Sequence, residues 1–292
     1  MDQLDIFANS RDVTLRNDAL TALQRYDGAG ARRAMQTLAA EYPTDPHLQL
    51  LELLATAIDD DAKAASIGRH DAAMETATVL TVHVRPAAIQ LLGHREAKAW
   101  LSTLWQRLAQ RCAALEYRPR YADCHSAAFW LQAGDWHAAR QCVGATGSWR
   151  RIPAPLAWMA EATYHLEGIE ATWPMLAELA WLSPARFDTV ASRLADASLD
   201  ALLLAFNAQF EGNGDGSDLV YFPVWALIEK PGLARWLVQA QPSRRFTPER
   251  AMRLVLNLLI LEREGRQREL LTRRRELQEL SPAVYRAYMR TR

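Results

Sequence analysis

Apolar residues recur every three or four positions along most of the chain, which is the spacing of the buried face of an amphipathic helix. In the first such segment, Leu15, Ala19 and Leu23 fall on one face, and residues 31–39 repeat the pattern. No segment alternates apolar and polar residues for more than a few positions, as a half-buried strand would. The pattern therefore predicts an all-α fold.

Glycine and proline divide these helical segments into pairs, because glycine permits a tight turn and proline stops a helix. The clearest pairs flank Gly134, Gly168 and Gly265, and Ser281-Pro282 starts a terminal helix. The expected helices are 15–28, 31–39, 47–58, 62–67, 71–84, 87–92, 95–117, 121–133, 136–143, 153–167, 170–182, a hairpin over 184–210, 219–228, 231–240, 251–264, 266–280 and 282–288. This order predicts an array of antiparallel helical hairpins, with an irregular helical bundle as the alternative.

One segment, Glu211–Asp218, is a clear loop, with three glycines in six residues. Glycine-rich polar stretches between periodic segments are typical of loops. We expect the array to bend here, which divides the chain into residues 1–210, an N-terminal helical repeat region, and residues 211–292, a C-terminal helical region.

The turn around Gly134 resembles that of the tetratricopeptide repeat (TPR) family. A TPR unit of 34 residues has a turn glycine, an aromatic residue two positions later and a small residue five positions later; Gly134, Trp136 and Ala139 match. Gly168 follows Gly134 by 34 residues, the period of that family. Fixed-period recurrence of helical pairs is the signature of a helical repeat array.

Further units match the TPR pattern only in part. Proline follows the turn glycine of the second and last units at Pro184 and Pro282, but bulky Trp173 and Leu270 occupy the small position. The resemblance covers about half of the chain, in four or five degenerate units, and implies a TPR-like α-solenoid.

The resemblance implies a non-catalytic scaffold or assembly factor that presents a groove to another protein, without a cofactor. In family members that clamp a carboxylate tail, lysine, asparagine and arginine face the groove, whereas the corresponding positions here include Cys124, Ala128 and Trp158. Since a carboxylate needs charge-assisted donors, no such tail peptide is expected. The partner is instead expected to be a helix or an extended apolar segment. The predicted groove residues are Tyr121, Gln132, Trp158 and His165.

The glycine-rich loop and the aromatic residues after it form a second predicted partner surface, at Asp215, Asp218, Tyr221 and Trp225. The acidic spacing in this loop resembles the start of an EF-hand calcium loop. However, the position that must supply a bidentate glutamate is Phe222. No calcium site is therefore predicted.

Cysteine and histidine form no recognisable catalytic or metal-binding pattern. The adjacent Cys124 and His125 point about 100° apart on a helix, and His70, His83 and His94 are spaced too far apart to share a helical turn. An enzyme whose site is dispersed over the array remains an alternative. Three sparse cysteines indicate reduced thiols and a cytoplasmic protein. The N-terminus lacks a signal-peptide pattern, and no apolar run approaches the ~18 residues of a membrane span.

Charge is balanced overall but unevenly distributed. The formal net charge is zero, yet Glu41–Glu75 carries −6 and Arg263–Arg292 carries +5. Three interpretations follow: head-to-tail association of copies, contact of the basic end with nucleic acid, or two solvated helix faces. Because the whole chain is neutral, we do not expect a general polyanion binder, and a regulatory protein that binds nucleic acid through its basic end is the alternative function. The 31 arginines against 3 lysines indicate a GC-rich, bacterial coding bias.

Overall fold

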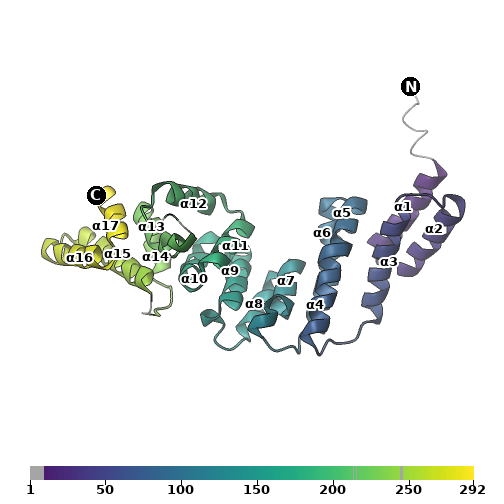
Figure 1. The fold of residues 1–292 in the computed structure, drawn as a ribbon, viewed down its shortest axis with the longest axis horizontal. Helices are drawn as coiled ribbons and strands as arrows, with labels where there is room; N and C mark the ends of the chain where they lie inside the picture. The colour runs from purple at the N-terminus through teal and green to yellow at the C-terminus, as the bar shows by residue number, and fades with distance from the viewer. Residues whose placement is uncertain (1–9, 213, 215, 244–245) are drawn as a thin grey trace, which may run out of the picture. The chain divides into compact units, whose positions relative to one another are not determined.

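The computed structural model describes residues 10–212, 214, 216–243 and 246–292, and in these residues every regular element is helical (Figure 1). The predicted all-α class is confirmed for this part of the chain. The chain forms two compact units, Met1–Asp135 (unit 1) and Trp136–Arg292 (unit 2). The predicted boundary between residues 210 and 211 lies inside unit 2.

Unit 1 is built from successive helices joined by short turns. Its elements are α1 (Arg11–Gln24), α2 (Gly28–Glu41), α3 (Leu48–Lys63), α4 (His70–Val79), a π-helical turn (Leu80–Val84), α5 (Arg85–Leu92), α6 (His94–Arg111), a 3₁₀ turn (Pro119–Cys124) and α7 (Ser126–Ala133). Helix α1 packs on α2, α2 on α3, and α6 on both α5 and α7.

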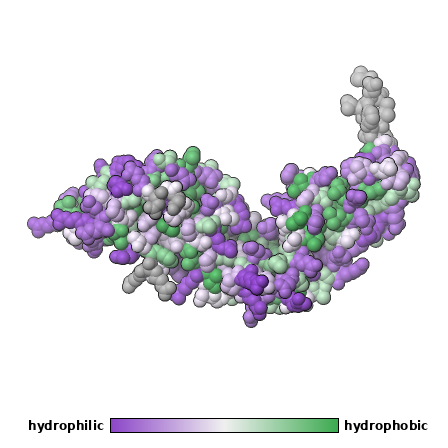
Figure 2. Space-filling model, in the orientation of Figure 1, coloured by the Kyte–Doolittle hydropathy of each residue, from purple (hydrophilic) through white to green (hydrophobic). Residues whose placement is uncertain are grey.

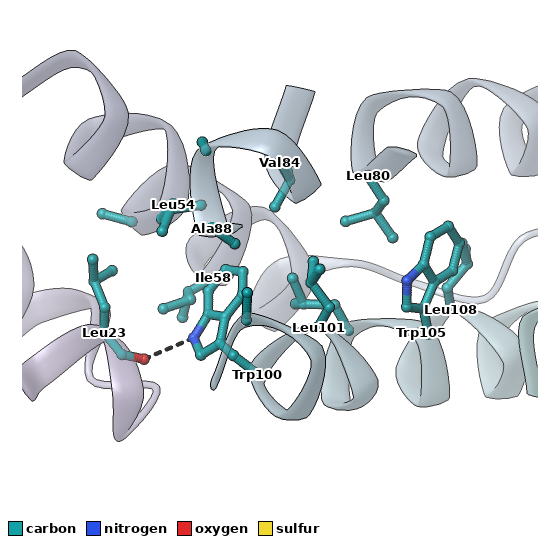
Figure 3. Packing of buried hydrophobic residues seen from close by; sticks show 14 of the residues in the cluster. Leu23, Leu54, Ile58, Leu80, Val84, Ala88, Trp100, Leu101, Trp105 and Leu108 are labelled. Carbon is teal, nitrogen blue, oxygen red and sulfur yellow. Dashed lines mark hydrogen bonds between the residues drawn. The ribbon is translucent and has the colours of Figure 1, made fainter. Parts of the chain in front are cut away.

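The long helix α6 carries the centre of the unit 1 core. Its inner stripe includes Trp100, Leu104 and Leu108, which are all buried. The Trp100 indole N–H donates a hydrogen bond of 2.9 Å to the Leu23 carbonyl of α1 (Figure 3). The Trp100 ring also stacks on Tyr26, with ring centroids 5.6 Å apart. Residues about 75 positions apart in the sequence are thereby tied together by one side chain.

Unit 2 contains the remaining helices. Its elements are α8 (Trp136–Gly144), α9 (Pro153–Glu167), α10 (Ile169–Leu182), α11 (Pro184–Leu194), α12 (Ala197–Gln209), α13 (Phe222–Glu229), α14 (Ala234–Leu237), α15 (Thr247–Glu264), α16 (Gln267–Leu280) and α17 (Pro282–Arg290), with 3₁₀ turns at Trp149–Arg151, Gly216–Tyr221 and Pro231–Leu233. Helices α9 and α10 are buried nearly all round, as expected of helices without a polar face.

The single residue Gly168 joins α9 to α10. Its φ of 87° and ψ of −179° lie in a region that residues with a Cβ essentially never adopt. Gly93 has nearly the same conformation, with φ 81° and ψ 165°, between α5 and α6. These two glycines allow one helix to end and the next to begin within a single residue.

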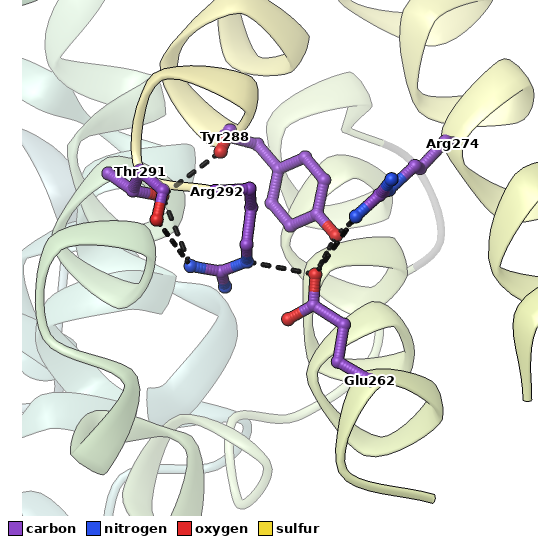
Figure 4. A network of polar contacts seen from close by, with 5 residues as sticks. All are labelled: Glu262, Arg274, Tyr288, Thr291 and Arg292. Carbon is purple, nitrogen blue, oxygen red and sulfur yellow. Dashed lines mark hydrogen bonds and ion pairs between the residues drawn. The ribbon is translucent and has the colours of Figure 1, made fainter. Parts of the chain in front are cut away.

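A polar network fixes the C-terminal helix α17 in unit 2. Glu262 of α15 accepts hydrogen bonds from the Tyr288 hydroxyl, from Arg292 Nε at 2.8 Å and from Arg274 Nη2 at 3.4 Å (Figure 4). The guanidinium groups of Arg274 and Arg292 also lie over the Tyr288 ring, at 5.5 and 4.9 Å from its centroid. Burial raises the pKa of Tyr288, so its hydroxyl stays a donor.

Two predicted helix ends in unit 1 are wrong. The acidic run at residues 59–61 does not break a helix, because α3 continues to Lys63 while Asp59 pairs with Arg32 and Asp61 with Arg107. The helix also does not stop before Pro86. Instead the chain widens into a π turn, in which the Arg85 N–H donates to the Leu80 carbonyl, and this turn accommodates the missing N–H of proline.

Other predicted elements also differ from the structure; for example, the helix predicted over residues 231–240 is a 3₁₀ turn followed by α14, which ends at Leu237. Residues 64–69 form no helix, the helix predicted from 95 to 117 ends at Arg111, and the helix predicted from residue 121 begins at Ser126, after a 3₁₀ turn. In contrast, the hairpin around Gly168 has its predicted ends within one residue.

A candidate partner-binding pocket in unit 1

A pocket of about 270 Å³ opens on unit 1, and its apolar floor is surrounded by carboxylates. The floor includes Val79, Leu80 and Val84 from one side and Leu104 and Leu108 of α6 from the other. The remaining lining residues are Ala57, Asp60, Asp61, Glu75, Thr76 and Arg111. The pocket is large enough for one or two aliphatic side chains.

The lining residues come from four elements of unit 1. The last turns of α3 supply Asp60 and Asp61, helix α4 supplies Glu75 and Val79, and α6 supplies the apolar face opposite them. The π turn contributes Leu80 and Val84, which lie near α6 in the core (Figure 3). A π turn inside an α-helix is rare and occurs often at functional sites.

The carboxylates on the rim differ in their partners. Asp61 is held by Arg107, whose Nη1 lies 2.6 Å from Asp61 Oδ2. The guanidinium of Arg111 donates from Nε to the Ala65 carbonyl at 3.0 Å. Asp60 and Glu75 are exposed and form no ion pair with any residue that the structure describes. The rim therefore offers two carboxylates to an incoming cation.

Exposed apolar side chains lie on the same helical stretch, and one of them, Val79, lines the pocket. Met74 is 47% exposed, Val79 43% and Val82 55%, which makes them three of the most exposed large hydrophobic residues of the described chain. On the visible face of unit 1, Figure 2 shows hydrophobic residues gathered over α5 and α6. An exposed apolar patch with a polar rim is typical of an interaction site.

Unit 2 has a larger hollow, of about 980 Å³, along α15 and α16. Three arginines and three glutamates line it, so its formal charges cancel. Arg273 there pairs with Glu276 at 2.6 Å, and the buried Glu249 accepts hydrogen bonds from Ser243. Its surface is therefore neutral and largely self-paired, and it favours no class of ligand by charge.

The four predicted groove residues do not form one surface within either unit. Tyr121 and Gln132 belong to unit 1, whereas Trp158 and His165 belong to unit 2. Trp158 is only 4% exposed, so it is a core residue of α9 and not a groove residue. His165 is exposed and stacks on Trp136, with centroids 3.8 Å apart. Gln132 is exposed, and Tyr121 lies half-buried next to the His70 ring at 5.1 Å.

The second predicted surface is also largely internal. Trp225 is 1% exposed and belongs to the core, and Asp218 is 7% exposed. The Asp218 carboxylate accepts a hydrogen bond of 2.7 Å from the Gly214 N–H, so it closes the loop on itself. Tyr221 stacks on Phe210 at 5.7 Å, and Asp215 lies outside the described residues.

The cysteines of unit 1 are in environments that suppress thiolate chemistry. Burial raises the pKa of Cys112 to about 11 and also raises the pKa of Cys124, so both thiols are protonated near neutral pH. Burial lowers the pKa of His125, whose Nδ1 accepts from the Ala127 N–H at the start of α7. Within the described ranges, no three residues of the histidine, cysteine, aspartate and glutamate types are grouped to hold a metal ion.

The arginine-rich C-terminal segment is less open to polyanions than its charge indicates. Six of its nine arginines form ion pairs within unit 2: Arg266 with Glu264 and Glu269, Arg273 with Glu276, Arg274 and Arg292 with Glu262, Arg286 with Glu211, and Arg290 with Glu229. Arg268 and Arg275 of α16 are exposed and form no ion pair in the part of the chain that the structure describes.

Sequence reasoning missed the pocket residues Asp60, Glu75 and Val79, and the exposed Val82 on the same helical stretch. A signal that could have found them was present, because the acidic stretch Glu41–Glu75 ends within a helical segment that carries Met74, Val79 and Val82. An amphipathic helix normally buries its apolar residues, so the pattern alone does not mark these three as exposed.

In comparisons with known proteins, no protein-family model, no curated protein and no solved structure matches the chain. None of the described helices combines the length and the apolar character needed to cross a membrane.

Proposed function

We propose that this protein is a non-catalytic scaffold of helical hairpins, similar in kind to TPR proteins, that binds a basic amphipathic helix of a partner protein. The observation that supports this function best is the pocket of unit 1, with an apolar floor that includes the exposed Val79 and two carboxylates without ion pairs on its rim. The three free cysteines favour a reducing compartment such as the cytoplasm.

A partner helix that lies across this pocket can contact both its apolar floor and the carboxylates of its rim. Inserting one leucine-sized side chain into the floor contributes about 1.5–3 kcal/mol of apolar burial. A lysine or arginine one turn away on the same helix can reach Asp60 or Glu75, and such charge pairing favours association rate and specificity. Recognition of amphipathic helices by apolar grooves is a recurring mode of protein binding.

The same charges argue against nucleic acid as the occupant of this pocket. Phosphate groups are repelled by Asp60 and Glu75, and the arginines of the C-terminal segment are mostly neutralised by glutamates. A helix with basic residues therefore fits the pocket better than a polyanion does.

The experiment is a selection of helical peptides from a displayed library on the full-length protein, with Val79→Asp as the matched negative variant. Wild type is expected to enrich peptides that carry an apolar residue with lysine or arginine three or four positions away. V79D is expected to bind these peptides at least about tenfold more weakly, because a carboxylate then interrupts the apolar floor. Leu204→Asp, at a residue of α12 that is 74% exposed, is the control for an added surface charge.

The proposal fails if wild type and V79D enrich the same sequences with equal affinity, or if wild type enriches no basic amphipathic peptide. Because Val79 is 43% exposed, the substitution leaves the fold intact, which far-UV circular dichroism can verify.

A further inference from the structure

Helix α16 presents a surface that matches the pocket of unit 1 in chemistry. Leu271 is 56% exposed, and Arg268 and Arg275 lie three positions before and four positions after it. Residues at these spacings share one face of a helix. We call Arg268, Leu271 and Arg275 the basic face of α16.

The neighbouring charges of α16 are engaged elsewhere. Arg266 pairs with Glu264 and Glu269, Arg273 pairs with Glu276, and Arg274 turns toward Glu262 and Tyr288. Gln267 and Gln278 lie at the two ends of the basic face, and Glu279, four positions after Arg275, is the acid of α16 nearest to it. The basic face is thus an apolar residue between two exposed arginines on a helix held firmly in unit 2.

The pocket of unit 1 has the opposite arrangement. Asp60 on α3 and Glu75 on α4 line it together with the apolar floor, so an inserted leucine would lie close to two carboxylates. Arg268 and Arg275 are separated by seven residues, which is about 10 Å along a helix axis. A span of this length lets the two arginines flank a leucine that enters the pocket.

We propose that the occupant of the pocket is α16 of a second copy of this chain. Leu271 of one copy fills the floor of the other, while Arg268 and Arg275 pair with Asp60 and Glu75. The inference rests on the proposed function of the same pocket and names its partner. The two surfaces differ, so the interface is heterologous: in a pair of copies, one keeps its pocket free and the other keeps its basic face free. Such an interface forms rings or open chains of copies that associate head to tail.

The experiment is sedimentation velocity of the full-length protein from about 1 to about 100 µM, at low and at high salt. A receiving-site variant, Asp60→Lys with Glu75→Lys, and a donor variant, Leu271→Asp, are measured alone and mixed in equal amounts. The matched controls are Asp188→Lys with Asp200→Lys, which makes the same charge change on α11 and α12, and Leu204→Asp, which makes the same apolar-to-acid change on α12.

Wild type and both controls are expected to form species larger than one chain as concentration rises, and less so at high salt because charge pairing is screened. Each interface variant alone is expected to stay monomeric, with its apparent Kd raised at least about tenfold. The mixture is expected to form a species of two chains and nothing larger, since only one intact donor and one intact pocket remain.

The inference is overturned if wild type stays monomeric over the whole range, if the interface variants associate as wild type does, or if the mixture forms no two-chain species. Arg268→Gln with Arg275→Gln provides a second donor variant that adds no acid. If association is absent but the peptide selection still depends on Val79, another protein is the partner. If both the self-association and the Val79-dependent peptide selection are absent, the inference and the proposed function both fail.

Discussion

Replacing Trp158 by alanine tests whether this residue belongs to the core or to a binding surface. Trp158 lies in the middle of α9 and is 4% exposed, and α9 packs on α8, α10 and α11. A tryptophan in such a position supports the packing of several helices at once. A groove residue would instead leave most of its ring in solvent until a partner arrives.

The expected effect follows from the area that the indole buries. A buried tryptophan removes roughly 150–250 Å² from water, which corresponds to about 4–6 kcal/mol at about 25 cal/mol per Å². Measured truncations of buried tryptophan to alanine usually cost about 3–5 kcal/mol. We expect W158A to lower the free energy of unfolding of unit 2 by this amount, which is a large part of the stability of a typical domain.

The assay is equilibrium unfolding in urea followed by far-UV circular dichroism, because tryptophan fluorescence changes with the substitution itself. With a slope of about 2 kcal/mol per M, the loss shifts the midpoint by about 1.5–2.5 M. Two units can unfold in separate transitions, and only the transition of unit 2 should move. Trp100→Ala, in the core of unit 1, should move the other one.

His165→Ala is the matched control on the same helix. His165 is exposed and contacts Trp136 by stacking, so its loss should cost no more than about 0.5–1.5 kcal/mol. A free energy of unfolding for W158A within about 1 kcal/mol of wild type would refute the core assignment and return Trp158 to the list of candidate groove residues.

Three further predictions concern single side chains. Burial raises the pKa of Tyr26 to about 12, from about 10 in the unfolded chain, so its contribution to stability is complete below about pH 10 and is lost between about pH 10 and about pH 12. Urea unfolding across this window should therefore show a smaller pH dependence for Y26F than for wild type. Glu262→Gln should lower stability by about 1–2 kcal/mol and speed amide exchange in α17, since the carboxylate accepts from Tyr288 and two arginines; unchanged exchange would count against this network. A thiol reagent should modify the half-buried Cys142 first, because the other two cysteines are buried, and equal rates for all three would contradict the burial.

Local features of the chain were readable from the sequence. Helical periodicity and the glycine turns depend on residues close to one another, and the α9–α10 hairpin around Gly168 has its predicted ends within one residue. Helix ends that were predicted from runs of polar residues were less reliable. The acids at 59–61 remain helical because arginines from α2 and α6 pair with them, and such partners are invisible at the level of one helix.

Only the tertiary structure decided which apolar residues are buried and which are exposed. Trp158 and Trp225 lie in the core, while Met74, Val79 and Val82 remain in contact with solvent, although all five have the side chains of core residues. The pocket joins α3, the π turn and α6, whose residues are up to about fifty positions apart. The sequence determined by itself where helices form, because helical hydrogen bonds and turn conformations are local. The candidate site depends on the packing of distant helices against one another, and no local pattern encodes that packing.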